Sequence, residues 1–134
     1  MGLDRFVKAQ ESDYLQALSE LRKGQKKGHW MWYVFPQIAG LGYSEMSKQY
    51  AIKNLEEAKE YLAHPILGKR LIEISRSLLS HQATARQIMG SPDDLKLRSS
   101  MTLFSIVPQT DVVFDQVLQK FFGGDKDPAT LELL

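Results

Sequence analysis

Residues 91–104 read SPDDLKLRSSMTLF and carry the clearest helix-start signal of the chain. Ser91 offers a capping hydroxyl, a proline suits the first helical position, and two acids favour the positive end of the helix dipole. Apolar residues then recur at Leu97, Met101 and Phe104, with the i, i+4, i+7 spacing of one helix face. This stretch predicts a helix whose apolar side is buried in a core.

The same signals continue along the rest of the chain. Caps, apolar stripes and stop residues predict the following segments: a short helix around residues 3–10, one capped by Ser12 and ended by Gly24, one capped by Asn54 and stopped by His64-Pro65, one over residues 67–78, one from Thr110 or Asp111 to Gly123, and a short turn opened by Asp127-Pro128. Only residues 30–35 have the aromatic and β-branched density of a strand, and no second strand is available to pair with them. We therefore predict an all-α fold, a compact single-domain orthogonal bundle of six to eight short helices over residues 1–134.

Composition narrows the function classes. The chain has 134 residues, with 17 Lys+Arg against 16 Asp+Glu, and it has no cysteine. The charge balance gives no broad field for nucleic acid or for a membrane surface. The missing cysteine excludes disulfides, thiolate zinc sites and a cysteine nucleophile. Because the sequence has neither a signal-peptide pattern nor an apolar run of spanning length, we expect a cytoplasmic protein.

Both tryptophans lie in one aromatic-basic segment, residues 24–37. Two lysines between glycines lead into it, and such a pairing can stack a ring and neutralise a phosphate. Trp30 or Trp32 would stack the ring, Gln37 would orient it, and His29 would hold an anion or take part in catalysis. In the alternative interpretation the aromatic residues are the largest side chains packed in the core, and the lysines lie in a solvated turn. Because residues two apart cannot share one helix face, burial of both tryptophans would need two covered sides.

The second candidate segment is the polar side of residues 91–104. On a helix, Lys96 and Ser99 lie on one face at i and i+3, and Asp94 and Arg98 are spaced i, i+4. Lys96, Arg98 and Ser99 could hold an anion, with Asp94 as the acid or base. In the alternative interpretation the start is a helix cap, followed by an ion pair and small residues that allow close packing.

The histidines do not predict a metal site. His29, His64 and His81 lack ligand spacing, and His64 and His81 stand at helix boundaries, where a structural role is expected. Nucleophile-elbow, dinucleotide-binding, P-loop and EF-hand patterns are missing too, so the sequence predicts neither a metal nor a cofactor.

Five stretches of the chain form a more specific pattern: LDRFVKAQ (3–10), HWMWYVFPQIAGLGYSEMSKQYAI (29–52), EAKEYLAHPILGKRL (57–71), PDDLKLRSSMTLF (92–104) and VLQKFFGGDKDPATLELL (117–134). They resemble a bacterial family catalogued as a domain of unknown function, the eighteen-ten family, whose members are sometimes labelled calpastatin. The resemblance implies a small, mostly helical single domain and brings no established activity. The calpastatin label does not suit a helical pattern without repeats. A much weaker resemblance, carried by residues 6–10 and the leucine-rich helices, is to the NADAR superfamily, whose members process ADP-ribose-linked nucleotides.

Two hypotheses follow. In the first, the two candidate segments converge on a pocket that binds, and could process, a small anionic or nucleotide-like ligand of the ADP-ribose type. In the second, the chain is a non-enzymatic interaction or dimerisation module, which would place a tryptophan on an open convex surface and would show self-association.

Overall fold

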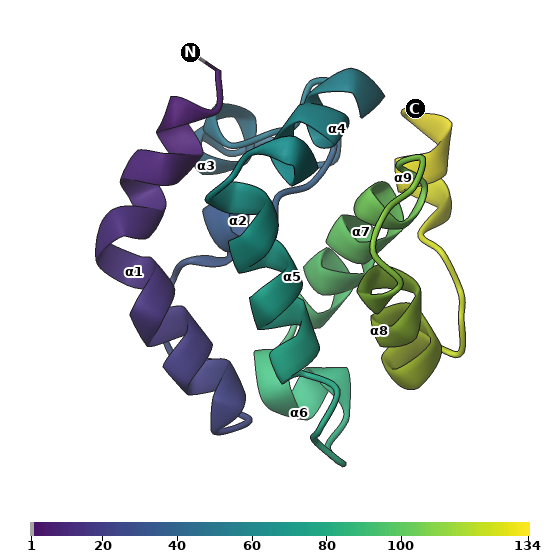
Figure 1. Cartoon of the computed structure of the whole chain (residues 1–134). Coiled ribbons are helices and arrows are strands. Elements are labelled where there is room, and N and C mark those ends of the chain that lie inside the picture. Colours follow the sequence, from purple (N-terminus) through teal and green to yellow (C-terminus); the bar gives the residue numbers. More distant parts are fainter. Residues whose placement is uncertain (1) are drawn as a thin grey trace.

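The computed structural model describes residues 2–134, and these residues contain nine helices joined by loops (Figure 1). They are α1 Asp4–Arg22, α2 Met31–Val34, α3 Glu45–Gln49, α4 Leu55–Ala63, α5 Leu67–Ser77, α6 Ala85–Met89, α7 Asp93–Ser105, α8 Val113–Phe122 and α9 Pro128–Glu132. Within these residues the only β-type pairing is one isolated parallel bridge between Ile38 and Ile52. The all-α prediction is therefore confirmed. The nine helices exceed the expected six to eight. Four of them, α2, α3, α6 and α9, have only four or five residues each.

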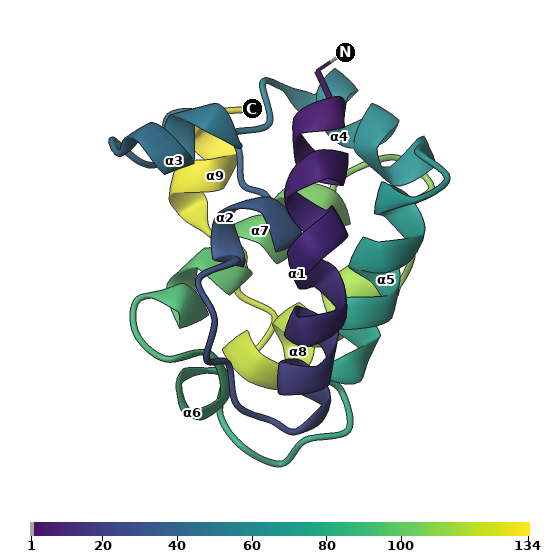
Figure 2. The ribbon, with the colours of Figure 1, turned by 90° about the vertical axis from the view of Figure 1, so that its left-hand side faces the viewer.

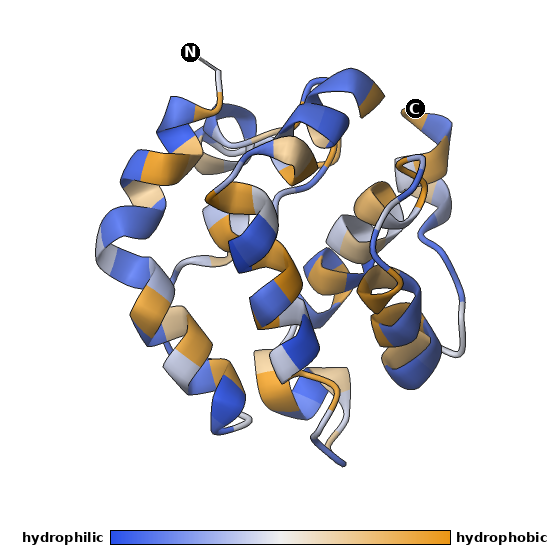
Figure 3. Ribbon diagram, in the orientation of Figure 1, coloured by the Kyte–Doolittle hydropathy of each residue, from blue (hydrophilic) through white to orange (hydrophobic). Residues whose placement is uncertain are grey.

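Helix α7 runs through the middle of the molecule, with α8 and α9 on either side of it in the view of Figure 2. Leu97, Met101 and Phe104, the predicted apolar stripe, are all fully buried. The ring of Phe104 contacts Tyr61 of α4 at 5.4 Å between centroids and Phe114 of α8 at 5.8 Å. Hydrophobic and hydrophilic residues alternate along α5 and α8, as in helices that bury one side (Figure 3).

The N-terminal segment is one helix of 19 residues, where two were expected. Ser12 does not cap a second helix; it is exposed in the middle of α1. The buried face continues across it through Phe6, Gln10 and Tyr14, so nothing interrupts the hydrogen-bond ladder. Among residues 2–134, neither α1 nor any other helix has the length and apolar character that a membrane span requires.

The start of α7 also differs from its prediction. Ser91 is exposed and makes no capping bond, and the N-cap position falls on Pro92. The amide of Asp94 instead donates to the carbonyl of Gly90 at 2.9 Å. A backbone turn therefore replaces the expected hydroxyl cap, while the two acids occupy the first turn as predicted.

Two of the histidines hold helix ends. The Nδ1 atom of His64 accepts hydrogen bonds from the amides of Ile66 and Leu67 at 3.1 and 3.2 Å, and so satisfies the start of α5. The Nε2 atom of His81 lies 2.6 Å from the carbonyl oxygen of Leu21, near the end of α1. Both histidines therefore make structural contacts, as expected of their places at helix boundaries.

Backbone pairing fixes the segment that follows α2. The amide of Ile52 donates to the carbonyl of Gln37, and the amide of Ala39 donates to the carbonyl of Ile52, both at 2.8 Å. Gly40 then has φ +103°, and a Cβ atom there would lie 3.1 Å from the side chain of Leu133. This glycine permits the turn and the close contact with the C-terminal segment.

Candidate functional site

A small hollow opens where α2 and the α2–α3 loop meet the first two turns of α7. It has a volume of about 210 Å³. Its lining combines an indole ring, an amide, an ammonium, a hydroxyl and three apolar side chains: Trp32, Gln37, Leu41, Pro92, Leu95, Lys96 and Ser99. We call it the Trp32 hollow. The two segments that the sequence singled out meet here, and four of the six expected ligand-binding residues, Trp32, Gln37, Lys96 and Ser99, line one site.

Two lysines share one aspartate beside this hollow. The Nζ atoms of Lys26 and Lys96 lie 2.8 and 3.2 Å from the carboxylate oxygens of Asp93. Each ammonium also lies over an indole ring, Lys26 at 4.9 Å from the centroid of Trp30 and Lys96 at 4.3 Å from that of Trp32. The contacts thus link both tryptophans through a single carboxylate.

The charge of this cluster does not cancel. Burial alone would raise the pKa of the Asp93 carboxyl, but the hydrogen bonds and charges of Lys26 and Lys96 outweigh burial and lower the pKa. Asp93 is therefore ionised at neutral pH. With two ammonium groups against one carboxylate, the three side chains carry a net positive charge.

Gln37 supplies an amide without a partner. Its side chain is only 5% exposed, and its Nε2 atom has no hydrogen-bond partner within residues 2–134. The backbone pairing with Ile52 holds it in place. Native proteins leave few buried donors unpaired, so this atom needs an explanation.

Ser99 connects the hollow to the C-terminal segment. Its hydroxyl donates to the Oδ2 atom of Asp127 at 2.8 Å, and Thr130 donates to the same oxygen at 2.7 Å. Burial alone would raise the pKa of Asp127, but these hydroxyls and the backbone amides at the start of α9 outweigh burial and lower the pKa. A charged carboxylate is therefore bonded to a residue that lines the hollow.

Trp30 belongs to the core and does not line the Trp32 hollow. It is 2% exposed, and its indole N–H donates to the Oε1 atom of Glu20 at 2.9 Å. The same oxygen accepts from the amides of Lys27 and Gly28 at 2.8 and 2.9 Å. Burial alone would raise the pKa of Glu20, but its hydrogen-bond donors lower the pKa to about 2. Glu20 therefore anchors the lysine-rich loop, and the core interpretation applies to Trp30.

Arg98 serves the C-terminal segment and not the hollow. Its guanidinium donates to the carbonyls of Asp125 and Lys126, each at 2.9 Å. Thr102, one turn further along α7, accepts from the amide of Asp127 at 2.9 Å. The polar residues of α7 that were expected to hold an anion thus divide into two groups, and Arg98 falls in the structural one.

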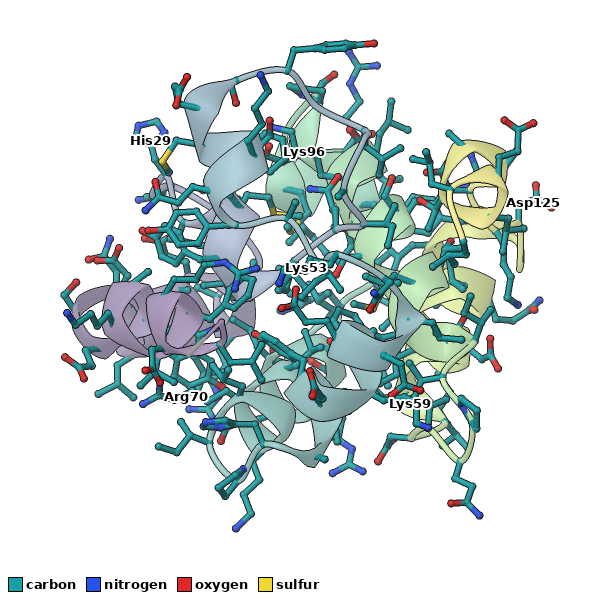
Figure 4. The ribbon with its side chains drawn as sticks, turned by 90° about the horizontal axis from the view of Figure 1, so that it is seen from above. His29, Lys53, Lys59, Arg70, Lys96 and Asp125 are labelled. Atoms are coloured by element: carbon teal, nitrogen blue, oxygen red, sulfur yellow. The ribbon has the colours of Figure 1, made fainter. Side chains whose placement is uncertain are left out.

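The two residues expected to be catalytic are not at the hollow. His29 is exposed on the loop between α1 and α2, at the edge of the molecule and apart from Lys96 (Figure 4). Asp94 is half-buried, and its Oδ1 atom is enclosed without a hydrogen-bond partner in the described chain, but it does not line the hollow. The arrangement thus provides groups for binding and gives neither residue a place in chemistry there.

Other hollows are larger but lack the expected site residues. One of about 330 Å³ lies between α4, α5 and the α7–α8 loop, and another of about 350 Å³ lies at the end of α1. None of the ligand-binding or catalytic candidates lines either of them. Within residues 2–134, no group of three or more His, Cys, Asp or Glu is placed to hold a metal ion.

Sequence reasoning missed the partners that support the site. Asp93 precedes Lys96 by three residues, so its ion pair could have been read from helix spacing. Lys26 and Asp127 are distant in sequence from the α7 residues they contact, and only the folded chain shows these contacts.

The chain matches a known protein family. Residues 1–134 match the family model described as "Protein of unknown function (DUF1810)". The chain belongs to this family. The match confirms the resemblance found in the five sequence stretches, whereas the weaker NADAR resemblance is not shown by it.

A solved structure shares both the fold and much of the sequence of this DUF1810 member. It is the crystal structure at 1.38 Å of the conserved hypothetical protein Rv1873 from Mycobacterium tuberculosis. The two share 47% sequence identity, with a TM-score of 0.96, over 98% of this chain and 95% of the other. No match was found among curated proteins. The relatives therefore fix family and fold, and any function must be argued from the site.

Proposed function

We propose that this protein binds a small ligand that combines a planar ring with an anionic group, and that the Trp32 hollow is the binding site. The observation that carries the proposal is the cation beside the ring. Lys96 lines the hollow, and its ammonium lies 4.3 Å from the centroid of the Trp32 indole, so an anion attached to a ring packed there has a cation within reach. Trp32 supplies a ring against which a planar group can pack. A nucleotide-like ligand, including one of the ADP-ribose type, has both parts.

The size of the hollow limits which part of the ligand enters. Sites for drug-sized ligands have about 300–1,000 Å³, and the hollow has about 210 Å³. A single ring system fits inside, while a sugar and its phosphates would extend over the surface beside Lys96. Since Asp94 and His29 do not line the hollow, the proposal is one of binding and assigns no reaction. We also propose that the protein is cytoplasmic, as expected from its sequence.

A second candidate function, an interaction or dimerisation module, is favoured by exposed apolar side chains near the hollow. Tyr43 is 89% exposed and Leu95 is 57% exposed. This hypothesis expected a tryptophan on an open convex surface, whereas Trp32 lines a hollow and Trp30 is buried. Light scattering across a range of concentrations distinguishes the two, because a module of this kind would associate without any small ligand.

A thermal-shift comparison tests the ligand proposal. AMP and ADP-ribose carry ring and charge together, adenosine carries the ring alone, and ribose 5-phosphate carries the charge alone. A ligand at ten times its Kd stabilises the fold by about 1.4 kcal/mol, which for a domain of this size raises Tm by roughly 4 °C. We expect the complete nucleotides to give the larger shift.

Two variants assign that shift to the hollow. Lys96→Met and Trp32→Leu should abolish it, whereas Lys59→Met should keep it. Lys59 is a matched control because it forms the same i, i+3 ion pair, with Glu56, on another helix. If no anionic ligand raises Tm at millimolar concentration, or if Lys96→Met responds like the unaltered protein, the proposal is wrong.

A further inference from the structure

The two most buried polar side chains of the Trp32 hollow keep their hydrogen-bond donors within the protein. Gln37 is 5% exposed, and its Nε2 atom is enclosed by the fold, so this amide nitrogen cannot reach a bound ligand. Ser99 is 8% exposed, and its single hydroxyl hydrogen has two acceptors nearby, the Oδ2 atom of Asp127 at 2.8 Å and the carbonyl oxygen of Leu95 at 3.2 Å. Neither side chain therefore offers a hydrogen to a group inside the hollow.

The other side chains of the lining are carbon apart from two nitrogen atoms. Three of them are aliphatic: Leu41, Pro92 and Leu95. The N–H of Trp32 lies in the plane of the indole, so it does not point at a group packed on the ring face. The ammonium of Lys96 is shared with Asp93 at 3.2 Å, and the proposed function gives it the anion of the ligand. In the described chain, none of the seven lining side chains therefore has a free donor for the edge of a ring.

This lining discriminates between rings by the polarity of their edges. A ring nitrogen with a lone pair accepts hydrogen bonds from water and loses them when it enters the hollow without finding a donor there. A C–H group in the same place has no such bond to lose, and it gains contact with the aliphatic side chains. Two rings of the same shape should therefore bind with different affinities.

We propose that the Trp32 hollow selects anions whose planar ring has a hydrocarbon edge. The ligand class is an aryl or benzo-fused ring joined to a phosphate or a carboxylate. The aliphatic wall formed by Leu41, Pro92 and Leu95 sets this specificity, and Lys96 holds the anion. This inference rests on the proposed function and narrows its ligand class. A nucleotide such as AMP still binds through its ring and its phosphate, but more weakly than an analogue without the ring nitrogens.

A matched pair of nucleotides tests the hydrocarbon edge. Purine riboside 5′-phosphate and benzimidazole riboside 5′-phosphate share the fused ring, the ribose and the phosphate. They differ only where benzimidazole has two C–H groups in place of two ring nitrogens. In calorimetric titrations we expect the benzimidazole nucleotide to bind about tenfold more tightly, because its ring leaves no buried acceptor without a donor.

Leu95→Gln adds a donor to the same wall. Leu95 is 57% exposed, so the fold should tolerate the change. The added amide should donate to a ring nitrogen, and the preference for the benzimidazole nucleotide should fall to about threefold or less. Leu15→Gln is the matched control, because Leu15 is an exposed leucine of α1 outside the hollow, and this variant should keep the full preference.

The possible results separate the two proposals. Equal affinities, tighter binding of the purine nucleotide, or binding of AMP without either analogue would each overturn the hydrocarbon edge and leave the proposed function standing. A preference that Leu95→Gln and Leu15→Gln both keep would also overturn it, because the preference would then come from the greater hydrophobicity of benzimidazole and not from the hollow. If neither analogue binds and AMP and ADP-ribose also fail to bind, both proposals fail.

Discussion

The ammonium of Lys96 lies 4.3 Å from the centroid of the Trp32 indole ring. The two residues come from α7 and α2, and their contact brings together the two segments that the sequence had marked separately. It also places a positive charge against the one tryptophan that lines a hollow.

Removing the charge of Asp93 should destabilise the fold. Asp93→Asn leaves Lys26, whose side chain is only 7% exposed, without its carboxylate. Loss of a partner in a fully buried pair costs about 3–5 kcal/mol, and partial exposure of Asp93 reduces this to about 2–3 kcal/mol. Urea unfolding measures the difference.

Asp94→Asn is the matched control for that substitution. It removes the same charge from the same helix turn, but Asp94 forms no ion pair among the residues described and has an enclosed oxygen without a partner. Its cost should be below about 1 kcal/mol, the usual size of a helix-dipole effect. Equal losses from both variants would show that the lysines do not depend on Asp93.

Glu20 predicts a pH dependence of stability. Its pKa falls from 4.5 to about 2 on folding, so the folded state binds fewer protons than the unfolded state in that range. The stabilisation is complete above pH 4.5 and is lost as the pH falls toward 2. Glu20→Gln should therefore cost about 2–3 kcal/mol at pH 7 and make the acid limb of the stability curve shallower.

Glu11→Gln is the control for the pH experiment, because Glu11 is exposed on the same helix. It should leave both the stability at pH 7 and the shape of the acid limb unchanged. An acid limb that is identical in Glu20→Gln and the unaltered protein would refute the anchoring role of Glu20.

Arg98 should matter for the C-terminal segment and not for the ligand. Arg98→Ala removes two hydrogen bonds to backbone carbonyls and should cost about 1–2 kcal/mol. Hydrogen exchange should speed up in residues 125–133, while affinity for the ligand stays within about twofold because Arg98 does not line the hollow. A large loss of affinity without faster exchange would return Arg98 to the binding site, as the sequence first suggested.

Most of the fold could be predicted from local signals in the sequence. Asn54 caps α4 as expected, with its side chain accepting from the amide of Glu57 at 2.9 Å, and Gly123 ends α8 in the left-handed conformation. Helix α6 was overlooked although Thr84 and Gln87 form a capping box. A capping hydroxyl within a continuous buried stripe, as at Ser12, marks no boundary, because neighbouring turns supply the hydrogen bonds.

The candidate site was less readable, because its residues depend on contacts distant in sequence. The spacing of the two tryptophans predicted that both could be buried only with two covered sides, and the fold covers Trp30 fully and Trp32 partly. No local pattern in the sequence indicated that Lys96 would line the hollow while Arg98 would not. The guanidinium of Arg98 donates to carbonyls of the segment before α9, and no residue near Arg98 in the sequence indicates that contact.

The most direct test of the ligand site follows side-chain N–H resonances by NMR during titration with AMP and ADP-ribose. The two indole signals are separate reporters, since Trp30 is bonded to Glu20 and Trp32 lines the hollow. We predict saturable shifts of the Trp32 indole and Gln37 amide signals, with the Trp30 indole signal nearly unmoved. Unchanged Trp32 and Gln37 signals at millimolar ligand, or shifts confined to another surface, would contradict a ligand site at the Trp32 hollow.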